Sequence, residues 1–146
     1  MMRNLDQRGV AAFEFCLVAV PLFTLMFVIF DLGRYAITAQ SLRTLANAGA
    51  RAMMINCYTP AVLTNTSPSS CTGDPLPSDA AKQAVAPLLY TTGGPPTLSI
   101  PAPAAGATAL TVTASQPNFI MPMTPLTAFI WPTTFNAPSA STSVPF

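Results

Sequence analysis

One long apolar run dominates the hydrophobic pattern of the chain, and an amphipathic pattern follows it. From Gly9 to Phe30 the only charged residue is Glu14, and the run is long enough for a membrane-spanning helix, which needs about 20 residues. Over residues 32–53 apolar residues recur at spacings of three and four, which predicts that the same helix continues. Together the two patterns predict one helix from about residue 10 to 55, roughly 70 Å long. Its apolar face beyond the run comprises Leu32, Tyr35, Ala39, Leu42, Leu45, Gly49 and Met53, and its polar face comprises Ala36, Gln40, Arg43, Asn47 and Arg51.

The second half of this predicted helix has two interpretations. In the first, its apolar face packs on a domain that the rest of the chain forms. In the second, it is a spine that packs against copies of itself. The small side chains along it would permit close helix approach; they are Ala39, Ala46, Ala48, Gly49, Ala50 and Ala52.

The rest of the chain is rich in Pro, Ser and Thr, and every proline except Pro21 lies after residue 57. Ser78 is a candidate N-cap for a helix over Asp79–Tyr90, which Pro87 would weaken or end early. Strands are predicted over residues 97–101, 109–115 and 139–144, and the second of these, ALTVTAS, alternates most clearly. The predicted fold class is α+β: a long N-terminal helix, then a small helix and a roughly three-stranded antiparallel sheet.

Residues 118–131, which contain most of the apolar segment FIMPMTPLTAFIWP, are interrupted by Pro122 and Pro125 and are predicted to form a loop or short turn. This apolar segment has two interpretations. It could bury Phe119, Phe129 and Trp131 in the domain's own core, because exposed apolar patches of this size are uncommon in monomers. It could instead be a contact surface for a partner. A composition rich in Pro, Ser and Thr also occurs in disordered segments, but the aromatic content here favours a modest core.

Cys57 and Cys71 flank a polar stretch of the chain. In an oxidising compartment a disulfide between them is the default interpretation, and closing a loop of about 15 residues would contribute roughly 3 kcal/mol. The alternatives are two free thiols or a metal site, although two sulfurs without histidine make a poor metal site. Cys16, inside the apolar run, is interpreted as a buried small apolar residue.

Composition argues against several classes of function. The formal net charge of +1 gives no electrostatic reason to expect a nucleic-acid partner. Charged residues make up only 8% of the chain, and histidine is absent. No nucleophile–base pair, phosphate-binding loop or metal-ligand spacing occurs, and Asp74 and Asp79 together offer too few oxygens for calcium. We therefore expect neither an enzyme nor a bound metal or cofactor.

Glu14 is the unusual residue of the apolar run, because an acid at the bilayer centre costs on the order of 3 kcal/mol. Near a helix N-terminus the cost is smaller, so Glu14 could simply snorkel or cap the first turn beside Arg8. Alternatively its position is functional. If the chain began at Val10, a new α-amino group with a pKa of about 8 would lie at the same depth. A cleaved signal peptide fits less well, because the apolar core is long and no A-x-A site follows closely.

The stretch RGVAAFEFCLVAVPLFTLMFVIFDLGR closely resembles the N-terminus of TadE-like minor pilins, the pseudopilins of the tight-adherence (Flp, type IVb) pilus machinery. The family pattern is a glycine, four residues, then Glu and an aromatic residue, followed by an apolar helix that contains Pro and ends near an acidic-x-Gly-Arg sequence. The later ALTVTASQPNFIMPMTPL looks like the family's C-terminal strand and Pro-rich turn. The matching residues at the N-terminus are Gly9, Val10, Glu14, Phe15, Pro21, Asp31, Gly33 and Arg34.

The resemblance implies that a prepilin peptidase cleaves after Gly9 and leaves Val10 as the first residue. It implies that Glu14 pairs with the N-terminal amine of a neighbouring subunit during assembly. Helix packing is implied for Phe15, Pro21, Asp31, Gly33 and Arg34. The corresponding organisation is a leader peptide over residues 1–9, a transmembrane helix over 10–31, a periplasmic extension of the helix over 32–56, and a small Pro/Ser/Thr-rich α+β domain over 57–146.

The predicted function is that of a pseudopilin that takes part in assembling a tight-adherence pilus for surface attachment. Its expected partners are other pilins, the inner-membrane assembly platform, the peptidase and membrane lipid. The alternative is a signal-anchored periplasmic binding or scaffold protein that never enters a filament. Arginines on both sides of the apolar run leave orientation open on the positive-inside rule. The family places the N-terminus in the cytoplasm, as a single pass through the bacterial inner membrane, with a possible place in an extracellular pilus.

Overall fold

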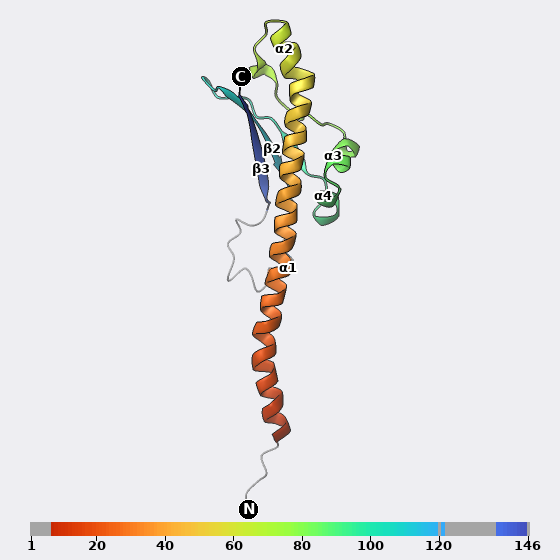
Figure 1. The fold of residues 1–146 in the computed structure, drawn as a ribbon, viewed down its shortest axis with the longest axis vertical. Coiled ribbons are helices and arrows are strands. Elements are labelled where there is room, and N and C mark those ends of the chain that lie inside the picture. Colours follow the sequence, from red (N-terminus) through yellow and green to blue (C-terminus); the bar gives the residue numbers. More distant parts are fainter. Residues whose placement is uncertain (1–6, 120, 122–136, 146) are drawn as a thin grey trace, which may run out of the picture.

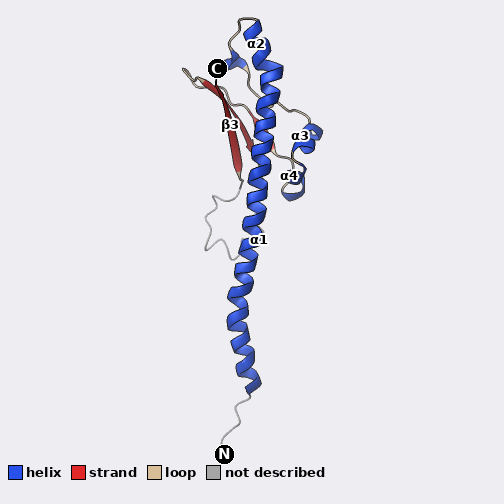
Figure 2. Ribbon diagram, in the orientation of Figure 1, coloured by secondary structure: helices blue, strands red, loops and turns tan. Residues whose placement is uncertain are grey.

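The computed structural model describes residues 7–119, 121 and 137–145, and it is built around one long helix. Helix α1 covers Gln7–Met53 without interruption. A small sheet and the short helices gather around its C-terminal half, while its N-terminal half extends away from them (Figures 1 and 2). The predicted α+β class and the predicted long helix are confirmed.

The helical segment continues further than residue 55. After α1 comes a wide π-helical turn, η1, over Met54–Tyr58, and then α2 over Thr59–Leu63. Pro60 is tolerated there because it lies at the start of α2, where a backbone donor is not needed. The polar segment that follows includes a single 3₁₀ turn, η2, over Pro68–Ser70, whose N-terminus is capped by the Ser67 side chain.

The predicted helix over residues 79–90 is two helices, α3 over Asp79–Val85 and α4 over Pro87–Thr92. The break lies at Ala86, whose backbone is extended (φ −140°, ψ 69°). A residue before proline avoids the helical conformation because it would clash with the proline ring, so Pro87 ends α3. Ser78 occupies the predicted N-cap position, but its side chain makes no capping hydrogen bond.

The sheet has the predicted three antiparallel strands: β1 over Thr97–Ser99, β2 over Ala109–Ser115 and β3 over Ser139–Pro145. Its order is β1-β2-β3, with Leu98 opposite Ala114 and Val112 opposite Thr142. Alternate residues of β2 are buried and the hydroxyl residues between them lie on the other face. This alternation is what the ALTVTAS pattern predicts.

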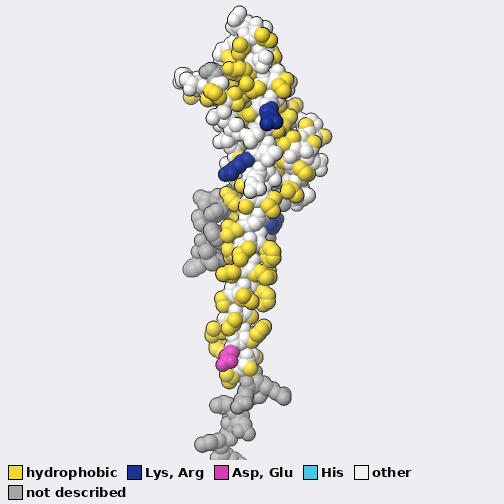
Figure 3. All heavy atoms as spheres, viewed as in Figure 1, with side chains coloured by type: hydrophobic (Ala, Val, Ile, Leu, Met, Phe, Trp, Pro, Cys, Tyr) yellow, Lys and Arg dark blue, Asp and Glu magenta, His cyan; other side chains and the backbone are white. Residues whose placement is uncertain are grey.

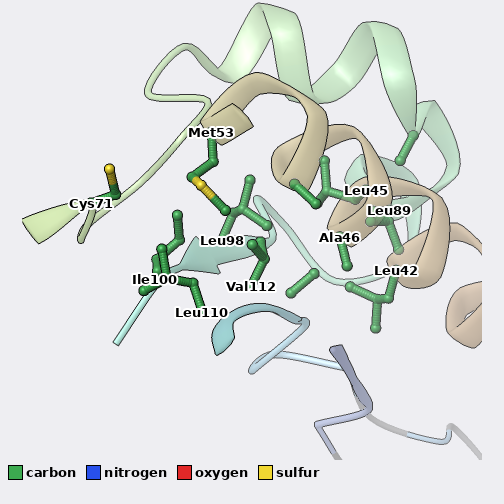
Figure 4. Close-up of a cluster of buried hydrophobic side chains, with 13 residues drawn as sticks. Leu42, Leu45, Ala46, Met53, Cys71, Leu89, Leu98, Ile100, Leu110 and Val112 are labelled. Atoms are coloured by element: carbon green, nitrogen blue, oxygen red, sulfur yellow. The ribbon is translucent and has the colours of Figure 1, made fainter. Parts of the chain in front are cut away.

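The core lies between α1 and the sheet (Figure 4). Leu42, Leu45 and Met53 of α1 are buried, as are Leu98 and Val112 of the sheet. The predicted polar face of the helix is exposed throughout, at Ala36, Gln40, Arg43, Asn47 and Arg51. The periodicity thus placed both faces correctly from Tyr35 onward, whereas Leu32, predicted on the apolar face, is exposed. Of the two interpretations, this face packs on the chain's own domain.

Two further predictions concern the segment after β2. Phe119 is buried, and its ring meets that of Tyr35 edge to face with centroids 6.3 Å apart. Met121 is buried as well. Phe129 and Trp131 lie outside the described residues.

A disulfide joins Cys57 to Cys71, as the pattern of cysteines predicted, with Cα atoms 5.9 Å apart. Cys71 is 3% exposed and belongs to the core, and Cys57 packs against it. The bond therefore joins the residue after η2 to η1 and closes the loop that contains α2. Cys16 is free and exposed on the surface of α1, like its neighbours along the apolar run, so no described part of the chain buries it.

Replacement of both Cys57 and Cys71 by serine should lower the free energy of unfolding by about 3 kcal/mol, because the unfolded chain regains the entropy of an open loop. Chemical denaturation of the detergent-solubilised full chain measures this loss, with Cys16→Ala as the matched control. In the unchanged chain, denatured without reduction, we expect one free thiol, that of Cys16. A count of three would show that the bond does not form.

Candidate functional site

The N-terminal half of α1 carries hydrophobic side chains along the face shown in Figure 3, and its described residues lie apart from the sheet and the short helices. From Val10 to Phe30 the large apolar side chains are exposed except for the half-buried Val28, with Phe15 at 70% and Phe30 at 62%. Among the described residues, this helix is the one long and apolar enough to cross a membrane. A helix that is apolar all round requires an apolar surrounding, so this segment is a candidate membrane anchor.

The residues predicted for processing lie at the start of this helix. Gly9 and Val10 are in the first turns of α1, and both are exposed. A side-chain carbon placed on Gly9 would meet no other atom within 4 Å. The chain itself therefore imposes no packing requirement for glycine at this position, and any requirement must come from a molecule that recognises it.

Glu14 lies one helical turn after Val10 and is exposed. Figure 3 shows an acidic side chain among hydrophobic ones in the lower part of the helix. Side chains of a helix lean toward its N-terminus, so the Glu14 carboxylate leans toward the level of Val10. No described residue forms an ion pair with it. This position allows the carboxylate to meet an amine at the depth of Val10, on its own chain or on a neighbouring one.

The residues expected to pack in the assembled state differ in their burial. Phe15 is exposed, Pro21 and Gly33 lie on the helix surface, and Gly33 has open space around its α-carbon. Arg34 is half-buried, whereas Asp31 is 6% exposed. The chain thus buries Asp31 itself, whereas Phe15, Pro21 and Gly33 are exposed on the surface of the helix.

The junction between the exposed half of α1 and the domain begins at Asp31. One turn later Tyr35 packs against Phe119. Thr38 is buried, and its hydroxyl donates to the carbonyl of Arg34 at 2.9 Å. Because this hydrogen bond lies within the helix, the buried Thr38 hydroxyl needs no partner from another element. The helix can therefore continue from its exposed apolar half into the domain without leaving this polar group unpaired.

The turn-rich segment before α3 contains an ion pair that sequence reasoning missed. Lys82 donates to one oxygen of Asp74, and the other oxygen of Asp74 accepts the backbone N–H of Leu76 at 2.9 Å. The Lys82 side chain is 8% exposed and that of Asp74 is 31% exposed. Asp74 was considered above only as a weak calcium ligand. The signal available in the sequence was that Lys82 is the only lysine of a chain with very few charges.

Replacement of Lys82 by methionine should lower the free energy of unfolding by about 2 kcal/mol, because a charge-assisted hydrogen bond to Asp74 is lost and its carboxylate stays partly desolvated. The partial exposure of Asp74 limits the loss. Thermal unfolding of the solubilised chain measures it. Gln83→Met, at the exposed neighbouring position, is the control and should change little. Equal stability of the two variants would mean that the ion pair contributes nothing.

Asp79, the other acid considered as a calcium ligand, interacts with the hydroxyl of Tyr90. The Tyr90 hydroxyl donates to the backbone carbonyl of Asp79 at 3.1 Å and lies 3.3 Å from its carboxylate. Burial raises the pKa of Tyr90, and the nearby charge of Asp79 raises it further. The hydroxyl therefore stays protonated as a donor that ties α4 to the start of α3.

Gln116 was also missed by sequence reasoning. Its side chain is fully buried, and Nε2 donates to the carbonyls of Leu89 at 3.1 Å and Gly94 at 2.7 Å. It thereby holds the end of α4 against the end of β2. A polar residue directly after a predicted strand was the only signal, and it does not distinguish a buried residue from a loop residue.

Comparison with known proteins gives one match. Residues 9–51 match the family described as TadE-like protein. The matched range begins at Gly9 and ends within α1, before the sheet and the short helices. No curated protein and no solved structure matches the chain.

Proposed function

We propose, from the match of residues 9–51 to the TadE-like family, that this chain is a minor pilin which is processed after Gly9 and takes part in assembling a tight-adherence pilus. The match itself suggests an association with the Tad pilus. The observation that carries the finer proposal is Glu14, an exposed acid without a described ion-pair partner on an apolar helix. Cleavage after Gly9 would create an amine one turn away from it.

The proposed function includes a location in the inner membrane and a set of protein and lipid partners. The apolar half of α1 is the inner-membrane anchor, with the N-terminus in the cytoplasm and the C-terminal domain in the periplasm. The disulfide between Cys57 and Cys71 supports this orientation, because such bonds persist in oxidising compartments. The partners are other pilins, the assembly platform, the prepilin peptidase and membrane lipid. The role is structural, in a pilus used for surface attachment, without an enzymatic step or cofactor.

The decisive experiment is the mass and N-terminal sequence of the chain extracted from membranes. We expect the mature chain to begin at Val10, and we expect Gly9→Phe to block this cleavage. We also expect the mature chain in the filament fraction that shearing releases from cells. A chain that retains residues 1–9 would reject the processing. A mature chain that never appears with filaments or with the assembly platform would favour the alternative, an anchored periplasmic scaffold.

A further inference from the structure

Toward the residues that the structure describes, the outer edge of β3 is open, whereas the outer side of β1 is partly closed. Beyond β1, Ile100 exchanges two backbone hydrogen bonds with Gly73, at 2.8 and 3.0 Å. Along β3 no hydrogen bond joins the outer edge to another described residue. An unpaired strand edge is a template for a further strand.

The hydrogen-bonding phase of β3 follows from its neighbour. The N–H of Gln116 donates to the carbonyl of Pro138 at 3.0 Å. Because bonded and non-bonded pairs alternate along an antiparallel ladder, residues 140, 142 and 144 bond to β2. The backbone groups of Ser139, Ser141 and Ser143 then point outward, and these residues are exposed. Three free backbone donors thus face away from the sheet.

A groove runs beside this edge. It has a volume of about 410 Å³ and is lined by α1 and η1 on one side and by the end of β3 on the other. The lining is almost entirely apolar, with Arg51 at one wall; Arg51 is exposed and forms no ion pair with a described residue. Ile55, also in the lining, is 72% exposed. The remaining lining residues are Ala50, Met54, Ser143, Val144 and Pro145.

We propose that the β3 edge and this groove bind an extended strand of another protein, with apolar side chains for the groove and a carboxylate for Arg51. The free donors of β3 would supply backbone hydrogen bonds to the added strand. The unpaired guanidinium at the groove wall selects an acidic group. The proposal goes beyond pilus assembly through Glu14 and does not depend on it.

Two other occupants fit less well. Arg51 lies roughly 30 Å along the helix from the end of the apolar run, which is too far for lipid of the same membrane. A second copy fits less well because of the direction in which β3 runs. Thr142 of β3 donates to Asn47, and residues 143–145 line the groove together with residues 50–55 of the helical segment. The strand β3 therefore runs parallel to α1. Antiparallel pairing of two β3 edges would point the two membrane helices in opposite directions.

The test uses the full chain in detergent and a probe peptide of seven residues with alternating valine and threonine and a glutamate at its N-terminal end. In an added antiparallel strand this glutamate lies near Arg51. We expect saturable binding, with slowed hydrogen exchange at the Ser141 and Ser143 amides. Ser141→Pro removes an outward donor without breaking the ladder to β2, and should weaken binding at least about tenfold. Arg51→Glu should weaken this peptide and favour one with lysine in place of glutamate.

A second probe covers the case in which Ser141→Pro fails to fold: the same peptide with N-methyl groups on the amides that face β3 should not bind the unchanged chain. The proposal is overturned if N-methylation or Ser141→Pro leaves binding unchanged, or if Arg51→Glu does not alter the charge preference. Slow exchange of the Ser141 amide without peptide would show that the chain covers its own edge. Self-association that Ser141→Pro abolishes would show that a second copy is the occupant. Either result overturns the proposal.

Discussion

Replacement of Glu14 by alanine is expected to leave cleavage after Gly9 intact and to lower incorporation of the chain into filaments at least about tenfold, a loss of about 1.4 kcal/mol. The expectation follows from the surroundings of Glu14, which lies among exposed apolar side chains one turn from the proposed new N-terminus. An ammonium and a carboxylate that meet in an apolar environment attract each other far more strongly than in water.

The effect of Glu14→Ala on filament incorporation distinguishes pairing with an amine from the alternative, in which Glu14 only snorkels or caps the first turn. An acid within the bilayer costs up to about 3 kcal/mol, so alanine should improve membrane insertion. If Glu14 only snorkelled or capped the first turn, the variant would reach the membrane at least as well and would assemble normally. Loss of filament incorporation at equal membrane abundance is therefore specific to pairing.

Two controls refine this measurement. Glu14→Gln keeps the shape and removes the charge, so it should behave like the alanine variant. Glu14→Asp keeps the charge on a shorter side chain and should recover part of the incorporation. Immunoblots of sheared filaments, normalised to the membrane fraction, give the comparison. Wild-type incorporation of the alanine and glutamine variants would refute the pairing hypothesis.

The sequence predicted those parts of the fold that depend on local pattern. The faces of α1 and the bounds of β2 follow directly from periods of three to four and of two, because each period leaves one face for the core. Pro87 was expected to weaken or end a helix, and it does so at Ala86. The segment matched to the TadE-like family was likewise readable, since charge, glycine and apolar length coincide within a short stretch.

The parts that sequence did not predict depend on contacts between distant segments. Gln116 is buried because it reaches Leu89 and Gly94, more than twenty positions away. Lys82 is buried because Asp74 lies beside it in space. The open edge of β3 depends on the order of the strands, and that order cannot be derived from the alternation within any one of them. Pairings of this kind are set by tertiary packing, which local propensity does not encode.

The way α1 divides its surface also bears on assembly. The face that meets the sheet is used within the chain, so this face is not free to act as a spine between copies. Among the described residues, the surfaces of α1 left for other molecules are its apolar N-terminal half, its exposed polar face and the part that lines the groove beside β3. Contacts of α1 with other molecules would therefore involve its apolar N-terminal half or its exposed polar face.

Replacement of Gly49 by valine is expected to lower the free energy of unfolding by about 3 kcal/mol, through overpacking of the core. Gly49 is buried where α1 approaches the sheet. A side-chain carbon at this position would lie 2.9 Å from Cδ2 of Leu98 and 3.2 Å from Cγ1 of Val112. Valine adds two further carbons, so the packed Leu98 and Val112 side chains would have to move, or α1 and the sheet would have to separate. Chemical denaturation of the solubilised chain gives the stability difference.

A control within the same helix isolates this packing effect from helix propensity. Gly33 has no atom within 4 Å of an added side-chain carbon, so Gly33→Ala should stabilise the chain by about 0.5–1 kcal/mol. Propensity alone would make both substitutions favourable, because valine also forms helix better than glycine. Opposite signs at Gly49 and Gly33 are therefore the signature of close helix–sheet approach. Combining Gly49→Val with Leu98→Ala should cost less than the sum of the two single losses, since the smaller side chain makes room for valine. Additive losses would contradict the contact.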